Sequence, residues 1–199
     1  MCKKERAKTY FRLGEQYTAV AKLTLNALIN GGNSNAGFGK TADEAEAEMI
    51  ENSSKSDLYL FVPAIFCCLQ STELYIKGLL LLNEIEIDDT HEIQKLLEKL
   101  QDKYNTNSSI YKAFRKIYYS EQEILKSYRL INKISNAQEL YISLRYPEST
   151  TGKQYEYYPL MYNGDEGIKL FKRINELIID IKHQVWVEYI NLYDESGAG

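Results

Sequence analysis

Residues 56–83 read SDLYLFVPAIFCCLQSTELYIKGLLLLN and form the most apolar stretch of the chain. The stretch is too long for a β-strand and is rich in Leu, Ala and Ile, so it predicts one long buried helix. Pro63 predicts either a kink in this helix or a start beyond that residue. The apolar run that begins at Leu58 ends at Gln70. Because a membrane-spanning helix needs roughly 20 apolar residues, we expect no membrane contact.

Apolar residues also recur at helical spacing on both sides of this segment. We expect further helices over residues 5–30, 43–52, 91–104, 109–118, 121–144 and 166–193, or one continuous helix across 109–144. The composition of residues 31–43 predicts a flexible loop, and the prolines and glycines of 145–165 predict a second, longer loop. Amphipathic helices joined by short connections predict an all-α fold, an up-and-down bundle of about five or six helices. The 199 residues fit one domain, 1–199.

The charge balance restricts the kind of ligand. The chain has 24 Lys and Arg residues against 28 Asp and Glu residues, a net charge of −4 at pH 7. Proteins that hold long nucleic acids through many phosphates usually carry a basic surplus. The balance argues against non-specific duplex binding and leaves room for a small basic pocket for a nucleotide or an RNA end. Arg115 and Lys116 make the middle helices locally basic, but the acids between such residues indicate a solvated face.

The cysteines indicate neither a disulfide framework nor a metal site. There are three, Cys2, Cys67 and Cys68, and two of them are adjacent in the apolar segment. No CxxC pair or histidine cluster accompanies them, so we predict no metal and no cofactor. The basic N-terminal residues lack the apolar core of a signal peptide, which predicts a cytoplasmic protein.

Three polar residues interrupt the apolar segment. Gln70, Glu73 and Lys77 have the i, i+3, i+7 spacing that places side chains on one face of a helix. Burial of charge is costly unless the charges are paired, and Glu73 and Lys77 have the i, i+4 spacing that allows an ion pair. The face is either a structural ion pair in the core or the polar wall of a binding cleft or subunit interface.

Two segments resemble a known family. Residues 70–100, QSTELYIKGLLLLNEIEIDDTHEIQKLLEKL, combine this polar face with His91 at the start of the next helix, and residues 139–148 read ELYISLRYPE. Together, within 57–148, they resemble the hallmark of the HEPN (higher eukaryotes and prokaryotes nucleotide-binding) family. The resemblance implies a helical fold that usually forms a homodimer. Its members are metal-independent ribonucleases or non-catalytic nucleotide or RNA binders, often beside a minimal nucleotidyltransferase in toxin–antitoxin or defence pairs. The binding residues that it implies are Gln70, Glu73, Lys77, His91, Arg145, Tyr146 and Glu148.

The ribonuclease motif of that family can be sought directly. It is an Arg followed at four to six intervening residues by a His on one helix, where Arg stabilises phosphate charge and His transfers a proton. The two histidines are His91 and His183, and no Arg precedes either at that spacing. We therefore predict a non-catalytic nucleotide- or RNA-associated protein, with a nucleotidyltransferase as a possible partner. One alternative is a ribonuclease with an atypical site of Lys77, His91 and Arg145, and another is a purely structural interaction module.

Overall fold

The computed structural model describes residues 2–87 and 92–194. These residues form eight α-helices, and the all-α prediction is confirmed. The helices are α1 (Lys3–Asn30), α2 (Ala42–Ser54), α3 (Asp57–Leu82), α4 (Ile93–Tyr104), α5 (Ser109–Tyr118), α6 (Glu123–Asn132), α7 (Ala137–Ser143) and α8 (Gly164–Asp194), with a 3-10 helix η1 (Tyr158–Leu160) before the last. A single bridge between Glu148 and Gln154 lies in the predicted long loop.

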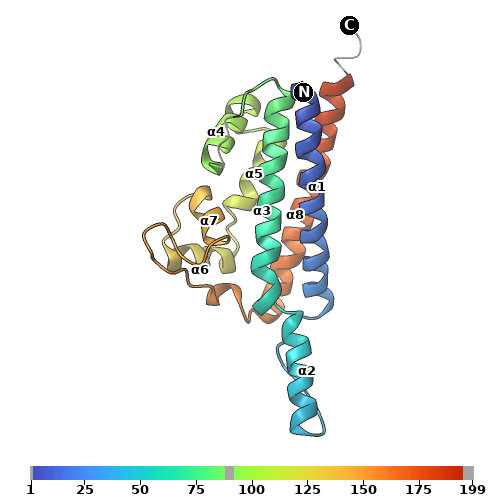
Figure 1. Cartoon of the computed structure of the whole chain (residues 1–199), viewed down its shortest axis with the longest axis vertical. Helices are drawn as coiled ribbons and strands as arrows, with labels where there is room; N and C mark the ends of the chain where they lie inside the picture. The colour runs from blue at the N-terminus through green and yellow to red at the C-terminus, as the bar shows by residue number, and fades with distance from the viewer. Residues whose placement is uncertain (1, 88–91, 195–199) are drawn as a thin grey trace.

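Helix α3 is the centre of the bundle, with α1 and α8 packed along it (Figure 1). Helix α1 runs antiparallel to both, while α3 and α8 run in the same direction because α4–α7 lie between them in the chain.

Two glycines allow α1 and α3 to approach closely. A Cβ on Gly78 would lie 2.4 Å from Cε1 of Phe11, and a Cβ on Gly14 would lie 2.8 Å from Cε1 of Tyr75. Any side chain at either position would force the two helices apart.

Helix α3 begins before Pro63, so this proline does not mark a late start of the helix. Ser56 caps the helix, its hydroxyl accepting a hydrogen bond from the Leu58 N–H, and the helix continues through an exposed Pro63. By length and composition alone, one 18-residue window within 42–82 is apolar enough to cross a membrane, and 83% of it is buried inside the bundle. The apolarity of the segment is thus that of a core helix.

Helices α4–α7 cover one side of α3 (Figure 1). The predicted helix over 121–144, and with it a continuous helix across 109–144, is wrong. Lys133 adopts a left-handed conformation with φ 57° and ends α6, and the Asn136 side chain then caps α7 by accepting from the Glu139 N–H. A residue with positive φ terminates a helix in the way that a C-terminal glycine does. The turn sets α7 against the polar face of α3.

Helix α2 projects from one end of the bundle as an arm (Figure 1). It begins at Ala42, close to the prediction, and residues 36–40 of the predicted loop lie along it. Hydrogen bonds join the Phe38 N–H to Glu48 (2.7 Å) and the Lys40 N–H to Glu44 (2.8 Å). No residue of α2 is buried, so polar contacts rather than a core hold the arm together.

Candidate functional site

The polar face of α3 is buried at Glu73 and Lys77 and half-buried at Gln70. Nζ of Lys77 lies 2.7 Å from Oε1 of Glu73, and the two side chains are 7% and 1% exposed. Gln70, one turn earlier, accepts a 2.5 Å hydrogen bond from the hydroxyl of Tyr141 on α7. Of the two interpretations of this face, the geometry is that of a structural ion pair in the core. A nucleotide cannot reach Lys77 without displacing the packing around it.

Tyr141 links this buried face to the surface. Burial raises the pKa of the Tyr141 hydroxyl, and the negative charge of Glu73 raises it further, whereas Arg145 lowers it. The hydroxyl is therefore neutral at ordinary pH and acts as a hydrogen-bond donor. Arg145 itself is exposed, with its guanidinium 5.1 Å from the centre of the Tyr146 ring. Arg145 is thus the one predicted site residue that combines exposure with proximity to the buried cluster.

The other predicted site residues do not join this cluster. Tyr146 is exposed beside Arg145, and Glu148 is exposed in the bridge with Gln154. His91 lies outside the described residues. The predicted residues therefore form an inner set (the buried Glu73 and Lys77 with the half-buried Gln70) and a surface set (Arg145, Tyr146 and Glu148), not one open cleft.

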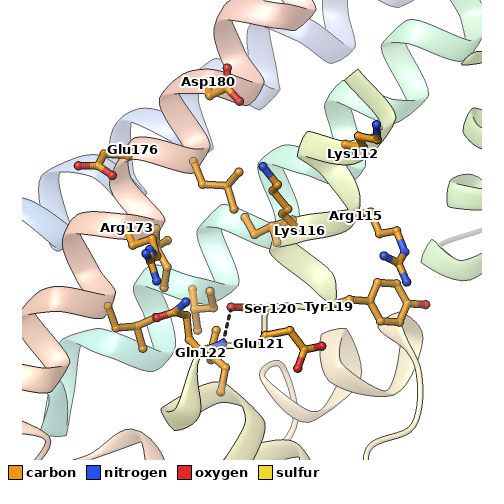
Figure 2. Close-up of a pocket in the computed structure, with 16 residues that line it drawn as sticks. Lys112, Arg115, Lys116, Tyr119, Ser120, Glu121, Gln122, Arg173, Glu176 and Asp180 are labelled. Atoms are coloured by element: carbon orange, nitrogen blue, oxygen red, sulfur yellow. Dashed lines mark hydrogen bonds between the residues drawn. The ribbon is translucent and has the colours of Figure 1, made fainter. Parts of the chain in front are cut away.

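A cavity of about 700 Å³ lies elsewhere, between α5, α8 and the connection from α5 to α6 (Figure 2). Its volume is typical of small-molecule sites. Apolar side chains from α3, α5, α6 and α8 line the cavity, and they are Ile65, Ile117, Leu125, Leu170, Ile174 and Leu177. Polar and charged groups lie around this lining, which is the arrangement that orients a ligand in an apolar pocket.

Four cations line the cavity. Lys112, Arg115 and Lys116 share one face of α5 by their i, i+3, i+4 spacing, and Arg173 lies across from them on α8 (Figure 2). Among the described residues, Lys112, Lys116 and Arg173 make no ion pair, while the Arg115 guanidinium lies 5.3 Å from the Tyr119 ring centre. Three unpaired cations are therefore available to an anion. Three acids, Glu121, Glu176 and Asp180, also line the cavity.

The hydrogen-bond donors gather at one part of the cavity. Figure 2 shows Ser120, Glu121 and Gln122 together on the turn below Lys116 and Arg173, whereas Glu176 and Asp180 lie further along α8. Arg129 fixes this corner by donating to the carbonyls of Tyr118 (3.2 Å) and Ser120. These bonds hold the turn in place, and within it the Ser120 hydroxyl accepts a hydrogen bond from the Gln122 N–H (3.3 Å), which leaves the Ser120 O–H available as a donor.

The sequence gives only part of this site. The spacing of Lys112, Arg115 and Lys116 identifies a basic face on one helix, but the acids between such residues led us to predict a solvated face. Arg173 is far away in sequence, and no local pattern places it opposite Lys116. The packing of α5 against α8 creates the cavity, and that packing is a property of the tertiary structure.

The HEPN domain family model matches residues 42–178. The chain belongs to the HEPN domain family. The predicted resemblance is therefore confirmed, and it extends beyond 57–148 to include α2 and much of α8. Comparisons with curated proteins and with solved structures give no match.

Membership of the HEPN family indicates a nucleotide- or RNA-related function. Of the cavity residues, all but Asp180 lie inside the matched region.

In the part of the chain that the structure describes, no three His, Cys, Asp or Glu side chains are grouped to hold a metal ion. Burial raises the pKa of the Cys68 thiol, so this cysteine is an apolar core residue and not a thiolate ligand.

Proposed function

We propose that this HEPN protein binds a nucleotide, or the phosphorylated end of an RNA, in the cavity between α5 and α8, and does not cleave it. The observation that carries the proposal is the pair formed by Lys116 and Arg173 on facing walls of an apolar-lined cavity. A phosphate between them would accept charge-assisted hydrogen bonds, which are stronger than neutral ones. Ser120 and Gln122 would supply further donors.

The apolar lining suits the remainder of a nucleotide. A base or sugar can cover Ile117, Ile174 and Leu177 once its phosphate is held at the basic corner. The acids along α8, Glu176 and Asp180, can accept from the sugar hydroxyls or an exocyclic amine. A cavity of about 700 Å³ accommodates one nucleotide or a short end and not a duplex. This agrees with the net charge of −4.

The first prediction concerns affinity. Lys116→Ala/Arg173→Ala should weaken binding of ATP and of a short 5′-phosphorylated RNA by more than about 100-fold, because hydrogen bonds to charged groups contribute roughly 1.5–3 kcal/mol each. Titration of a fluorescent ATP analogue and of labelled RNA measures the loss. Lys103→Ala/Lys126→Ala removes the same net charge from exposed positions outside the cavity and should leave affinity unchanged. Equal losses in both variants, or no binding by the wild type, would contradict the proposal.

The second prediction concerns catalysis. Labelled RNA incubated with the protein should remain intact, because no Arg precedes a His at the ribonuclease spacing and Lys77 is buried against Glu73. The informative variant is Arg145→Ala, because Arg145 is exposed and its loss leaves the core unchanged. Cleavage by the wild type that Arg145→Ala abolishes would instead support the ribonuclease alternative. The nucleotidyltransferase partner, the toxin–antitoxin setting and the cytoplasmic location stay predictions.

A further inference from the structure

A groove of about 540 Å³ lies where the α2 arm joins the bundle (Figure 1). Its walls come from the last turns of α2, the first turn of α3 and the segment before α8. The large side chains that line it are Met49, Ile50, Leu58, Tyr59 and Tyr162. We call this hollow the arm groove. It shares no residue with the cavity between α5 and α8, so it is separate from the proposed ligand site.

The side chains that line the arm groove are open to solvent. Ile50, Tyr59 and Tyr162 are 61%, 61% and 65% exposed, and Met49 is 45% exposed. Single exposed apolar residues are normal on a protein surface, but a contiguous group of them marks an interaction site. Tyr and Met are also enriched where proteins bind one another. The arm groove therefore suits the apolar face of another protein.

Both sides of the arm groove are held in place. On the arm, residues 36–40 lie directly against α2, since a Cβ on Gly37 would be 2.0 Å from the carbonyl oxygen of Ala45. On the bundle, the Asp57 carboxylate accepts from the Tyr162 N–H (2.8 Å) and holds Tyr162 at φ 60°. The groove is therefore formed before a partner arrives, which lowers the entropy lost on binding.

The arm carries as much negative charge as the whole chain. Residues 36–54 contain five acids and one lysine, a net charge of −4, and the net charge of the chain is also −4. Glu44 and Glu48 accept from N–H groups of residues 36–40, and Glu51 pairs with a lysine at the base of the arm. An acidic arm repels phosphates and anionic lipids, so nucleic acids and membranes are disfavoured as occupants.

Two acids of the arm remain available to a partner. Asp43 and Glu46 are exposed, and neither forms an ion pair with another described residue. Asp43, Glu46 and Ile50 have i, i+3, i+7 spacing, which places them on one face of α2. At a rise of about 1.5 Å per residue, Glu46 lies about 6 Å and Asp43 about 10 Å from Ile50 along the helix axis. Two carboxylates thus continue the line of the apolar groove along the arm.

We propose that the arm groove binds an amphipathic helix of a different protein, one whose apolar face is followed by Lys or Arg. Apolar side chains of this helix fill the groove against Ile50, Tyr59 and Tyr162. Its basic residues lie one turn and two turns beyond these anchors and pair with Glu46 and Asp43, because one helical turn rises about 5.4 Å. The apolar anchors supply affinity, and the flanking charges fix the orientation.

Two synthetic peptides test the proposal. Both are fluorescent helix-forming peptides of about 18 residues with Leu along one face, and the flanking positions are Lys in one and Glu in the other. Fluorescence anisotropy measures their binding. The wild type should bind the Leu/Lys peptide at least about tenfold more tightly than the Leu/Glu peptide, because charge complementarity sets the choice of partner.

Ile50→Ala/Tyr59→Ala should weaken binding of the Leu/Lys peptide by about tenfold or more, because a few central side chains carry most of the affinity of an interface. Both residues are largely exposed, so the variant should fold, and its circular dichroism spectrum checks this. Leu130→Ala is the matched control, because Leu130 is 69% exposed on α6, outside the groove. It should bind the peptide as the wild type does.

A charge exchange tests the acidic residues. Asp43→Lys/Glu46→Lys should reverse the preference, so that the Leu/Glu peptide binds more tightly than the Leu/Lys peptide. Glu98→Lys/Asp102→Lys makes the same change of net charge at exposed positions on α4 and should keep the wild-type preference. The same response in both charge variants would show a non-specific attraction and overturn the proposal.

Two further results would overturn the proposal. One is a wild type that binds neither peptide or binds both equally. The other is a groove that holds a second copy of this chain, in which case Ile50→Ala/Tyr59→Ala would lower the mass in solution and leave peptide binding unchanged. Titration of ATP into the same variants is a separate measurement, because the arm groove and the cavity share no residue. The proposed function and this proposal therefore stand or fall independently.

Discussion

Asp57→Ala should lower the free energy of unfolding by about 3–5 kcal/mol, although Asp57 lines no candidate binding site. Asp57 is completely buried at the first turn of α3. Its carboxylate accepts from the backbone N–H groups of Tyr162 and Asn163, both at 2.8 Å, and from the Asn33 side chain at 3.0 Å. Alanine would leave these donors inside the protein without their acceptor, which costs more than the hydrogen bonds contribute.

The contacts of Asp57 join three distant parts of the chain. Asn33 follows α1, and Tyr162 and Asn163 precede α8, so one carboxylate ties the ends of the three long helices together. Tyr162 has φ of 60°, in the left-handed region that few bulky L-residues adopt, whereas Asn33, with φ of 49°, is of a type that tolerates this region. Loss of Asp57 therefore removes the contact that offsets the strain at Tyr162. We expect these loops to lose protection from hydrogen exchange before the rest of the bundle.

Thermal and urea unfolding measure the effect of Asp57→Ala. For a chain of this size, each kcal/mol corresponds to about 2–4 °C in the unfolding midpoint. Asp43→Ala is the control, because Asp43 occupies the first turn of α2 in the same way but is exposed. It should leave the midpoint nearly unchanged. A small effect of Asp57→Ala would show that the loops hold their conformation without this carboxylate.

The sequence was sufficient for the helices because their apolar residues are periodic. The segment 56–83 is apolar on nearly every side and became the central helix, while residues 109–118 were placed to the residue. The break between α6 and α7 was missed, because Lys133 gives no local sign that it will adopt a positive φ. The close approach of α1 to α3 at Gly14 and Gly78 was likewise not predictable, because the sequence does not show which residues of the other helix pack against these glycines.

The candidate sites, like the helices, were only partly predictable from the sequence. The i, i+4 spacing of Glu73 and Lys77 inside an apolar helix was enough to predict their ion pair. It could not show whether the pair lies in a cleft or in the core, because α7 and its Tyr141, far away in sequence, cover that side of α3. The cavity depends on three long-range contacts at once, among α3, α5 and α8. Periodicity describes one helix at a time, so it cannot report a space between three of them.

The second large effect on stability is expected at the buried ion pair of Glu73 and Lys77. Lys77→Met should lower the free energy of unfolding by about 3–5 kcal/mol, because it leaves the Glu73 carboxylate in the core without its cation. Glu73→Gln/Lys77→Met removes both charges and should recover most of that loss, because a neutral pair needs no compensation for desolvation. Urea unfolding of the two single variants and the double variant forms a double-mutant cycle, which isolates the coupling between the residues.

The matched control for this cycle is the pair Glu51 and Lys55, which has the same i, i+4 spacing and a separation of 2.6 Å but is exposed at the end of α2. Lys55→Met should not move the midpoint, because solvent screens an exposed pair and its residues lose conformational freedom when they bind. If Lys77→Met is as stable as the wild type, then either water reaches Glu73, which makes the polar face of α3 an open site, or Glu73 takes up a proton in the core. Nucleotide titration of the same variant then decides its role, since a buried structural pair predicts full binding in every variant that folds. Loss of binding without loss of stability would move the site from the α5–α8 cavity to α3.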